Sequence, residues 1–274
     1  MLICCFGDVH GNLPAAYELV ARWEASRGKT IDAVLLAGDV AMYPDLNRMD
    51  SATKKHAKGD PTELFCSLYI EGKQEATRQT YFCRGNHEDH AWLRSRRNRA
   101  VDPAGKIVYL GGGEVHNLEQ GADPVRLLTI GGIQPPWEDP FSLGDGRNTD
   151  KYFEPKELRQ AEKLAAGSVD ILLSHEGPFG HCLTRKPDVG AMVLTRILER
   201  VHPRFHFFGH YGHPPPPVRV GTTWVVPLNQ EGVVRIPGRD GGMGILDTES
   251  WRFQFVLNVD SPKPPQAPWA TLQS

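Results

Sequence analysis

Side chains that can bind metal follow several apolar runs of this sequence, each at the point where the run ends. In chain order they are Asp8 and His10, then Asp39, then Asn86 with His87, then His175, and finally His210. If the runs are largely parallel strands, their carboxyl ends share the edge where α/β folds place their sites. One such histidine is more often a core residue, but five converging loops predict a common site.

The mixture of donor types at these positions narrows the choice of metal. Carboxylate, amide and imidazole donors together favour Mn²⁺, Fe²⁺ or Zn²⁺, whereas an all-oxygen set would favour Mg²⁺ or Ca²⁺. The five cysteines are odd in number and form no C-x-x-C pattern, so neither a thiolate zinc site nor a disulfide framework is indicated. We therefore interpret the cysteines as small buried hydrophobic residues.

The apolar runs alternate with segments of helical spacing, which is the pattern of an α/β layered domain. The expected strands are Leu2–Phe6, Ala33–Ala37, Tyr81–Cys83, Ile107–Leu110, Arg126–Ile130, Ile171–Leu173 and Phe205–Phe208. The expected helices are Pro14–Arg27, Thr62–Ala76, Glu88–Arg97, Pro155–Ala166 and Ala191–Val201. Segment Met42–Asp60 is polar and lacks periodicity, so we expect a surface loop near the rim of the site.

The pattern changes after the four consecutive prolines Pro214 to Pro217. Only strand-like runs follow, at Trp224–Val226, Val233–Ile236, Gly244–Leu246 and Phe253–Val256. Because this segment is short and has no predicted helix, it can bury too little apolar surface to form a core of its own. We therefore expect antiparallel strands that complete a second sheet of the same domain. Residues 1–258 would then form a single domain, and residues 259–274, rich in proline, a flexible tail.

Composition excludes several classes of protein. Hydrophobic residues make up 40% and charged residues 23% of the 274 residues, which disfavours disorder and coiled coils. A formal net charge of −2 provides no overall attraction to nucleic acid or to an anionic membrane. No apolar run approaches the roughly 18 residues of a membrane helix, and the first run is too short for a signal peptide. We therefore expect a cytoplasmic protein with no membrane partner.

Five motifs together resemble, in order, those of the calcineurin-like metallophosphoesterases. They are Gly7-Asp8-Val9-His10-Gly11-Asn12, Gly38-Asp39, Arg84-Gly85-Asn86-His87-Glu88, Ser174-His175-Glu176 and Gly209-His210, and they span about residues 3 to 213. The resemblance implies a two-layered β-sandwich flanked by helices, with a binuclear metal centre. It also implies one role for each ligand: Asp8 and His10 hold metal one, Asp39 bridges, and Asn86, His175 and His210 hold metal two. His87 would be the catalytic histidine.

The chemistry of phosphoester hydrolysis fits these roles. Two cations about 3.5–4 Å apart would share a hydroxide, orient it toward phosphorus and neutralise charge on the phosphoryl oxygens. His87 follows the ligand Asn86 and could protonate the leaving oxygen. Arg84 could clamp the phosphate through its forked guanidinium, or it could be an ordinary surface arginine at the end of a strand.

Two departures from the family pattern limit the choice of substrate. Many members continue the last motif as G-H-x-H, but here Gly212 stands in place of the second histidine, and His213 follows it. The serine/threonine protein phosphatases also lack that histidine, yet they carry a D-R-G continuation that is absent after Asp39. A protein phosphatase is therefore disfavoured.

A second resemblance is to the RNA lariat debranching enzymes. It lies in Tyr109–Gly113, Leu128–Ile133 and Asp170–Pro178, and it favours a phosphodiester substrate, with nucleic acid as one such partner. Many of those enzymes carry Cys where this chain has Asp8. The arginines Arg94, Arg96, Arg97 and Arg99 could steer a polyanion or form a solvated helix face.

We therefore expect a phosphoester hydrolase, with a phosphodiester as the favoured substrate. Hydrolysis would use a bridging hydroxide on two divalent metal ions and the catalytic histidine. Two alternatives stay open: a phosphomonoesterase that acts on protein or nucleotide, and a non-catalytic scaffold that keeps the fold.

Overall fold

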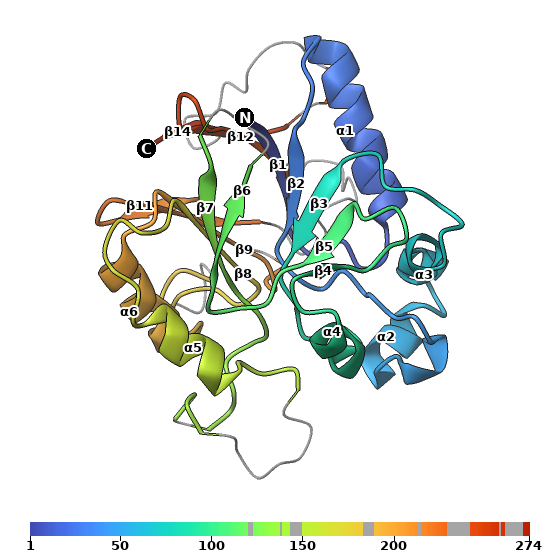
Figure 1. Ribbon diagram of the computed structural model, residues 1–274, viewed down its shortest axis with the longest axis horizontal. Helices are drawn as coiled ribbons and strands as arrows, with labels where there is room; N and C mark the ends of the chain where they lie inside the picture. The colour runs from blue at the N-terminus through green and yellow to red at the C-terminus, as the bar shows by residue number, and fades with distance from the viewer. Residues whose placement is uncertain are drawn as a thin grey trace.

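Two β-sheets pack face to face, and helices cover their outer faces (Figure 1). The computed structural model describes residues 1–119, 123–137, 139–142, 150–182, 189–212, 215–228, 242–257, 259–260 and 271–274. This arrangement is the α/β two-layered sandwich flanked by helices that the sequence predicts.

The eight-stranded sheet contains the first three strands of the chain side by side. Its order is β14 (Thr271–Gln273), β13 (Arg252–Phe255), β12 (Met243–Asp247), β1 (Leu2–Phe6), β2 (Ala33–Leu36), β3 (Gln79–Phe82), β5 (Ile107–Tyr109) and β4 (Arg99–Ala100). Strands β1, β2, β3 and β5 run parallel. Their carboxyl ends therefore lie at one edge of the sheet.

The six-stranded sheet supplies the other layer. Its order is β10 (Val218–Val220), β11 (Thr223–Pro227), β9 (Phe205–Phe208), β8 (Ile171–Ser174), β7 (Val125–Ile130) and β6 (Val115–Leu118). Strands β7, β8, β9 and β11 are parallel. Each sheet thus contributes its own set of parallel carboxyl ends to the site.

The helices lie outside the two sheets (Figure 1). Helices α1 (Leu13–Arg27), α3 (Cys66–Ile70) and α4 (His90–Ser95) lie on the side of the eight-stranded sheet, and α5 (Pro155–Ala161) and α6 (Met192–Val201) on the side of the six-stranded sheet. Asn12 caps the start of α1 by accepting a hydrogen bond from the Ala15 amide, and Gly28 ends it in the left-handed conformation (φ 61°).

Side-chain alternation along β1 explains why the central strands read as uninterrupted apolar runs. Ile3 and Cys5 point between the sheets and share a cluster with Phe207 of β9. Cys4 points to the other face and packs with Tyr17 of α1. Both faces of the strand are buried, so both alternating positions must be apolar. All five cysteines are buried free thiols, as expected.

The strands expected before residue 214 are present, and each expected helical segment contains a helix, but several helices are shorter than expected and some expectations about the connecting segments are wrong. Segment Met42–Asp60 is not a loop throughout: it contains the 3₁₀ turn Leu46–Arg48 and α2 (Ser51–His56). Asp50 caps α2 by accepting hydrogen bonds from the amides of Ala52 and Thr53. The helix expected over Thr62–Ala76 is split into the 3₁₀ turn Pro61–Leu64 and α3. Short edge strands β4, β6 and β10 escaped prediction because they have few residues to show a period.

The segment after the prolines divides between the two sheets, contrary to the expectation of one antiparallel set. Strand β11 joins the six-stranded sheet parallel to β9, whereas β12 and β13 extend the eight-stranded sheet antiparallel from β1. The expectation of a flexible tail is wrong for β14, which pairs with β13 and buries Leu272. The strand expected over Val233–Ile236 lies outside the described residues.

Candidate metal centre

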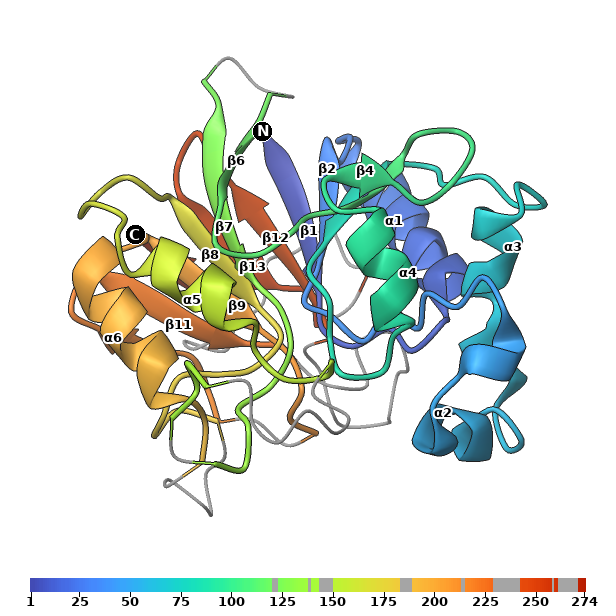
Figure 2. The ribbon, with the colours of Figure 1, turned by 60° about the horizontal axis from the view of Figure 1, so that its bottom comes forward.

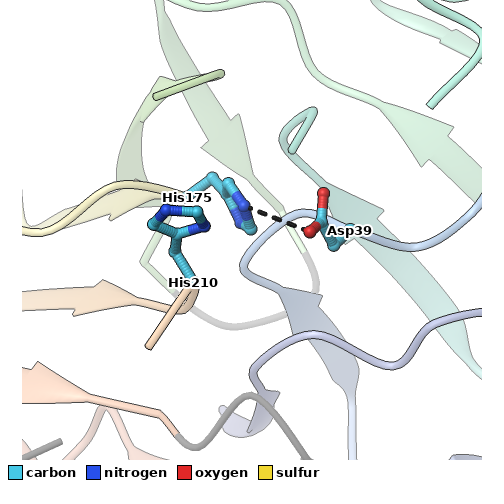
Figure 3. A group of neighbouring side chains, drawn as sticks. All are labelled: Asp39, His175 and His210. Carbon is cyan, nitrogen blue, oxygen red and sulfur yellow. Dashed lines mark ion pairs between the residues drawn. The ribbon is translucent and has the colours of Figure 1, made fainter. Parts of the chain in front are cut away.

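The predicted ligands come together at the carboxyl ends of β1, β2, β3, β8 and β9, so both sheets contribute to the site. Two groups of side chains have ligand atoms within 4.8 Å of one another: Asp8, His10 and Asp39, and Asp39, His175 and His210. Figure 3 shows the second group, in which Asp39 from the eight-stranded sheet faces the two histidines of the six-stranded sheet. Asp39 belongs to both groups.

Asp39 is held by one carboxylate oxygen while the other has no hydrogen-bond partner. Its Oδ1 accepts hydrogen bonds from the backbone amides of Asn86 (2.7 Å) and His87 (2.8 Å). Its Oδ2 lies 3.4 Å from Nε2 of His175 and has no hydrogen-bond partner among the described residues, although it is buried. A buried carboxylate oxygen without a hydrogen bond is costly unless a cation binds it.

His175 directs one ring nitrogen toward the same point. Its Nδ1 donates to the carbonyl oxygen of Ala37 (2.8 Å), which leaves Nε2 to face Oδ1 of Asn86 at 2.9 Å. The Ala37 bond fixes the ring as a metal-ligating histidine is usually fixed. Nε2 of His175, Oδ1 of Asn86 and Oδ2 of Asp39 can therefore share either a proton or a cation.

Three of the predicted ligands have left-handed backbone conformations. The φ angles are 42° at His10, 46° at Asp39 and 68° at His210. Such conformations are uncommon outside glycine and cluster at functional sites. The glycines of the motifs have a matching role, since a Cβ at Gly85 would lie 2.0 Å from Oδ1 of Asp39.

Burial and mutual charge shift the pKa values of the cluster in opposite directions. Burial raises the pKa of Asp8 to about 8. Burial acts in the same direction on Asp39, but His175 outweighs it and holds the pKa of Asp39 well below its usual range. Burial lowers the pKa of His175, yet Asp39 and Asp8 together raise it to about 10. Without a cation the cluster therefore retains a proton, and a metal would displace it.

His87 lies beside the ligands, and a residue that the sequence did not single out holds it in place. Its Nδ1 lies 3.0 Å from Oδ2 of Asp50, which also accepts hydrogen bonds from Tyr43 Oη (2.8 Å) and Thr53 Oγ1 (2.6 Å). Burial lowers the pKa of His87, but the hydrogen bond to Asp50 raises it above its usual value. The ring centroid lies 6.0 Å from that of His10.

Glu88 is a second functional residue that the sequence did not assign a role. Its buried carboxylate accepts hydrogen bonds from the amides of Val40 (2.9 Å) and Met42 (2.8 Å), and so holds the loop that follows Asp39. The feature of the sequence that could have pointed to Glu88 is its place in the third motif. For Asp50 the only signal was its helix-capping position before Ser51-Ala52-Thr53.

The contacts of Arg84 favour a structural role over the expected phosphate clamp. Its two terminal amino groups donate to the carbonyl oxygens of Asp150 and Tyr152, at 3.0 Å each. The side chain is 2% exposed, so it is not a surface arginine either. Arg84 therefore fixes the segment between β7 and α5.

Two of the four arginines beyond His87 form ion pairs. Arg97 pairs with the buried Glu157 at 2.8 Å, and Arg94 forms two hydrogen bonds with Asp150. Only Arg96 and Arg99 of this run lack such ion pairs within the described residues. His213, which follows Gly212, lies outside the described residues.

A sandwich with ligands at the carboxyl ends of its strands is the arrangement that the motif resemblance implied for a metal-dependent phosphoester hydrolase. The family model for calcineurin-like phosphoesterases matches residues 1–214. The chain therefore belongs to this family. Among the described residues, no helix is long and apolar enough to cross a membrane.

Curated relatives of this chain include lariat debranching enzymes. The chain is 28% identical over 241 residues to a lariat debranching enzyme of Drosophila melanogaster, a match of 77% of this chain and 42% of that protein. It is also 28% identical over 232 residues to a lariat debranching enzyme of Entamoeba histolytica, covering 76% of this chain and 63% of that protein. The chain thus matches less than two thirds of the length of these relatives.

Solved structures support the fold. The protein TT1561 of Thermus thermophilus aligns with a TM-score of 0.55 at 16% identity, covering 94% of this chain and 98% of its own. A dimetal phosphatase of Danio rerio aligns with a TM-score of 0.55 at 12% identity, covering 93% of this chain and 95% of its own. At these identities the similarity extends to the fold alone.

Proposed function

We propose that this protein hydrolyses phosphodiesters at a centre of two divalent metal ions, with Mn²⁺, Fe²⁺ or Zn²⁺ as the metals. The observation that carries the proposal is the position of Asp39, whose carboxylate belongs to both ligand groups. A shared carboxylate between two clusters of donors is the arrangement that two neighbouring cations require.

The ligand sets follow from the two groups. Asp8, His10 and Asp39 would hold one ion, and Asp39, Asn86, His175 and His210 the other. The buried Oδ2 of Asp39, which has no hydrogen bond within the described residues, and the mixed nitrogen and oxygen donors fit such ions. When bound, the two ions supply Lewis acidity, which lowers the pKa of water and neutralises charge on the phosphoryl oxygens.

His87 would donate the proton to the leaving oxygen. Asp50 binds Nδ1 of the ring, so Nε2 is the atom from which a protonated His87 would donate. Within the described residues no hydrogen bond occupies that Nε2. The raised pKa of His87 favours the protonated ring that a general acid needs.

Two observations support a diester over a monoester. The curated relatives are lariat debranching enzymes, and the layout from Tyr109 to Gly113 and from Leu128 to Ile133 resembles theirs. Asp8 replaces the cysteine that many of them carry. We therefore propose nucleic-acid phosphodiesters as the substrate class, without commitment to the 2′-5′ bond.

Metal content and a substrate panel test the proposal. Protein reconstituted with Mn²⁺ and desalted should retain two ions per chain by elemental analysis.

The kcat/KM for bis(p-nitrophenyl) phosphate should exceed that for p-nitrophenyl phosphate, and short linear and 2′-5′ branched RNA would then locate the preferred bond. Retention of at most one ion contradicts the two-metal centre, and a clear preference for the monoester contradicts the diester assignment. Bound metal without any hydrolysis would favour the scaffold.

A further inference from the structure

A pocket of about 540 Å³ lies between α4, α5 and the chain that connects β7 to α5. Figure 2 turns this end of the molecule toward the viewer. The residues that determine its chemistry are Arg94 of α4, Trp137, Phe141, Tyr152, Phe153 and Arg159 of α5. The volume is within the range typical of pockets for small organic groups.

Aromatic rings form much of the pocket wall. The rings of Trp137 and Tyr152 meet edge to face, with centroids 5.0 Å apart and planes at 77°. Tyr152 is fixed because its carbonyl oxygen accepts a hydrogen bond from Arg84. The guanidinium of Arg159 lies 5.7 Å above the ring of Phe141 and donates to the Phe141 carbonyl oxygen at 3.0 Å. These contacts hold the rings of the wall in place. Cations also lie over the rings of Phe141 and Tyr152, so among the described lining residues Trp137 has the ring best placed for another ring to stack on.

The charged groups of the lining favour an anionic ligand. Among the described lining residues, the cations Arg94, Lys156 and Arg159 outnumber the two carboxylates, those of Asp150 and Glu154. The ion pair of Arg94 with Asp150 is about half exposed, and exposed ion pairs contribute little stability. Arg94 can therefore turn toward a phosphate at little cost.

Two contacts tie the pocket directly to the loops that carry the metal ligands. Arg84, two residues before Asn86, binds the backbone of Asp150 and Tyr152. The amide of Gln134, three residues before Trp137, donates to Oε2 of Glu176, which follows His175. The pocket is thus held in a fixed position relative to the site of phosphoester cleavage.

We propose that this pocket is a base-binding subsite, which takes a nucleobase of the polynucleotide next to the scissile phosphodiester. The base stacks on the aromatic wall, and its phosphate lies toward Arg94. Stacking of bases on aromatic side chains beside cations is the usual way in which proteins hold single-stranded nucleic acid. The inference rests on the proposed phosphodiesterase function.

The test compares the affinity of the protein for an RNA that carries its bases with its affinity for the same RNA without bases. Full-length Mn²⁺-loaded protein is titrated into a labelled, phosphorothioate-linked RNA hexamer and into the same hexamer with abasic residues, and binding is followed by fluorescence anisotropy. We expect the hexamer with bases to bind about 10-fold tighter or more, as one stacked base provides. Trp137→Ala should bring this ratio close to one, and Trp137→Phe, which keeps a smaller aromatic ring, should give an intermediate ratio.

Trp251→Ala is the matched control, because Trp251 lies between β12 and β13, packs on Arg204 and does not line the pocket. It should keep the wild-type ratio. A ratio near one in the wild type, or an unchanged ratio in Trp137→Ala, would overturn the subsite. If the base dependence holds but no diester in the panel is hydrolysed, the proposed function fails and the subsite stands. If diesters are hydrolysed but binding does not depend on the bases, the proposed function stands and the subsite is contradicted.

Discussion

The two ligand groups that share Asp39 differ in how firmly the chain around them holds their side chains. In the group with His210, the ring of His175 is fully buried and both of its nitrogens have partners. In the other group His10 is only partly buried, and Gly212 occupies the place of a further histidine. One carboxylate can therefore join two sites of unequal strength, because hydrogen bonds that orient a ligand raise its affinity for the metal.

Asp39→Asn should have the largest effect, because it weakens both sites at once. Asparagine keeps the shape but removes the charge that two cations share. Metal content should fall from two ions per chain toward none, and kcat/KM should drop by more than about 10⁴-fold, the upper end for a single general acid. Elemental analysis and diester kinetics measure both effects. If one ion stays firmly bound, Asp39 does not bridge.

His87→Ala should lower the rate while leaving both ions in place. Loss of a general acid typically costs about 10²–10⁴-fold, and the loss should be greatest for alkoxide leaving groups. A p-nitrophenolate leaving group needs no proton and should suffer least. The measurement is kcat on both types of ester, with metal content determined for each protein. Equal losses on both esters would show that His87 orients phosphate or water instead.

His10→Ala tests the inequality of the two groups directly. Titration of wild-type protein with a chelator should release the ions in two phases, with affinities about 10- to 100-fold apart. His10→Ala should abolish the weaker phase and leave one ion per chain, whereas His175→Ala should remove the tighter one. Release of both ions in a single phase by the wild type would mean that the two groups bind with equal strength.

Asp50→Asn should reduce turnover by about 10-fold without loss of metal, which is less than the effect of removing His87. The amide still reaches the ring but carries no charge to support a protonated imidazole, so the pKa of His87 should fall. The alkaline limb of the kcat profile should therefore move to lower pH. An unchanged pH profile would show that Asp50 only caps α2.

His206→Phe should have the smallest effect. His206 is buried in β9 and contacts Ser174, the residue before the candidate ligand His175. Burial lowers the pKa of His206 to about 3, and its Nε2 lies 2.6 Å from Oγ of Ser174, which donates to the Glu176 carbonyl oxygen. An unfolded histidine has a pKa near 6.5, so below that pH the unfolded state binds more protons. The wild type should then lose about 2 kcal/mol of stability between pH 7 and pH 5.

Phenylalanine does not titrate, so the variant should lack this component of the acid dependence. Urea unfolding of both proteins at pH 7 and pH 5 gives the comparison. Equal losses in the two proteins would mean that His206 is not the group responsible.

The sequence alone determined the parallel core strands and the positions of the ligands. Leu2–Phe6 and Phe205–Phe208 are largely buried on both faces, so nearly every position is apolar, with His206 as the exception, and this local requirement is visible in the residues themselves. The polar residues after these strands were equally visible, because the carboxyl ends of parallel strands have one common edge.

Only the tertiary structure decided how distant segments meet. The partners of Arg84 lie 66 and 68 residues away along the chain. No periodicity of the sequence indicates that its terminal amino groups bind those carbonyl oxygens. Asp50 reached His87 only through the fold of α2. The assignment of β11 and β12 to different sheets likewise depended on which strand edges were open. Such contacts depend on packing between segments, which a pattern within one segment does not contain.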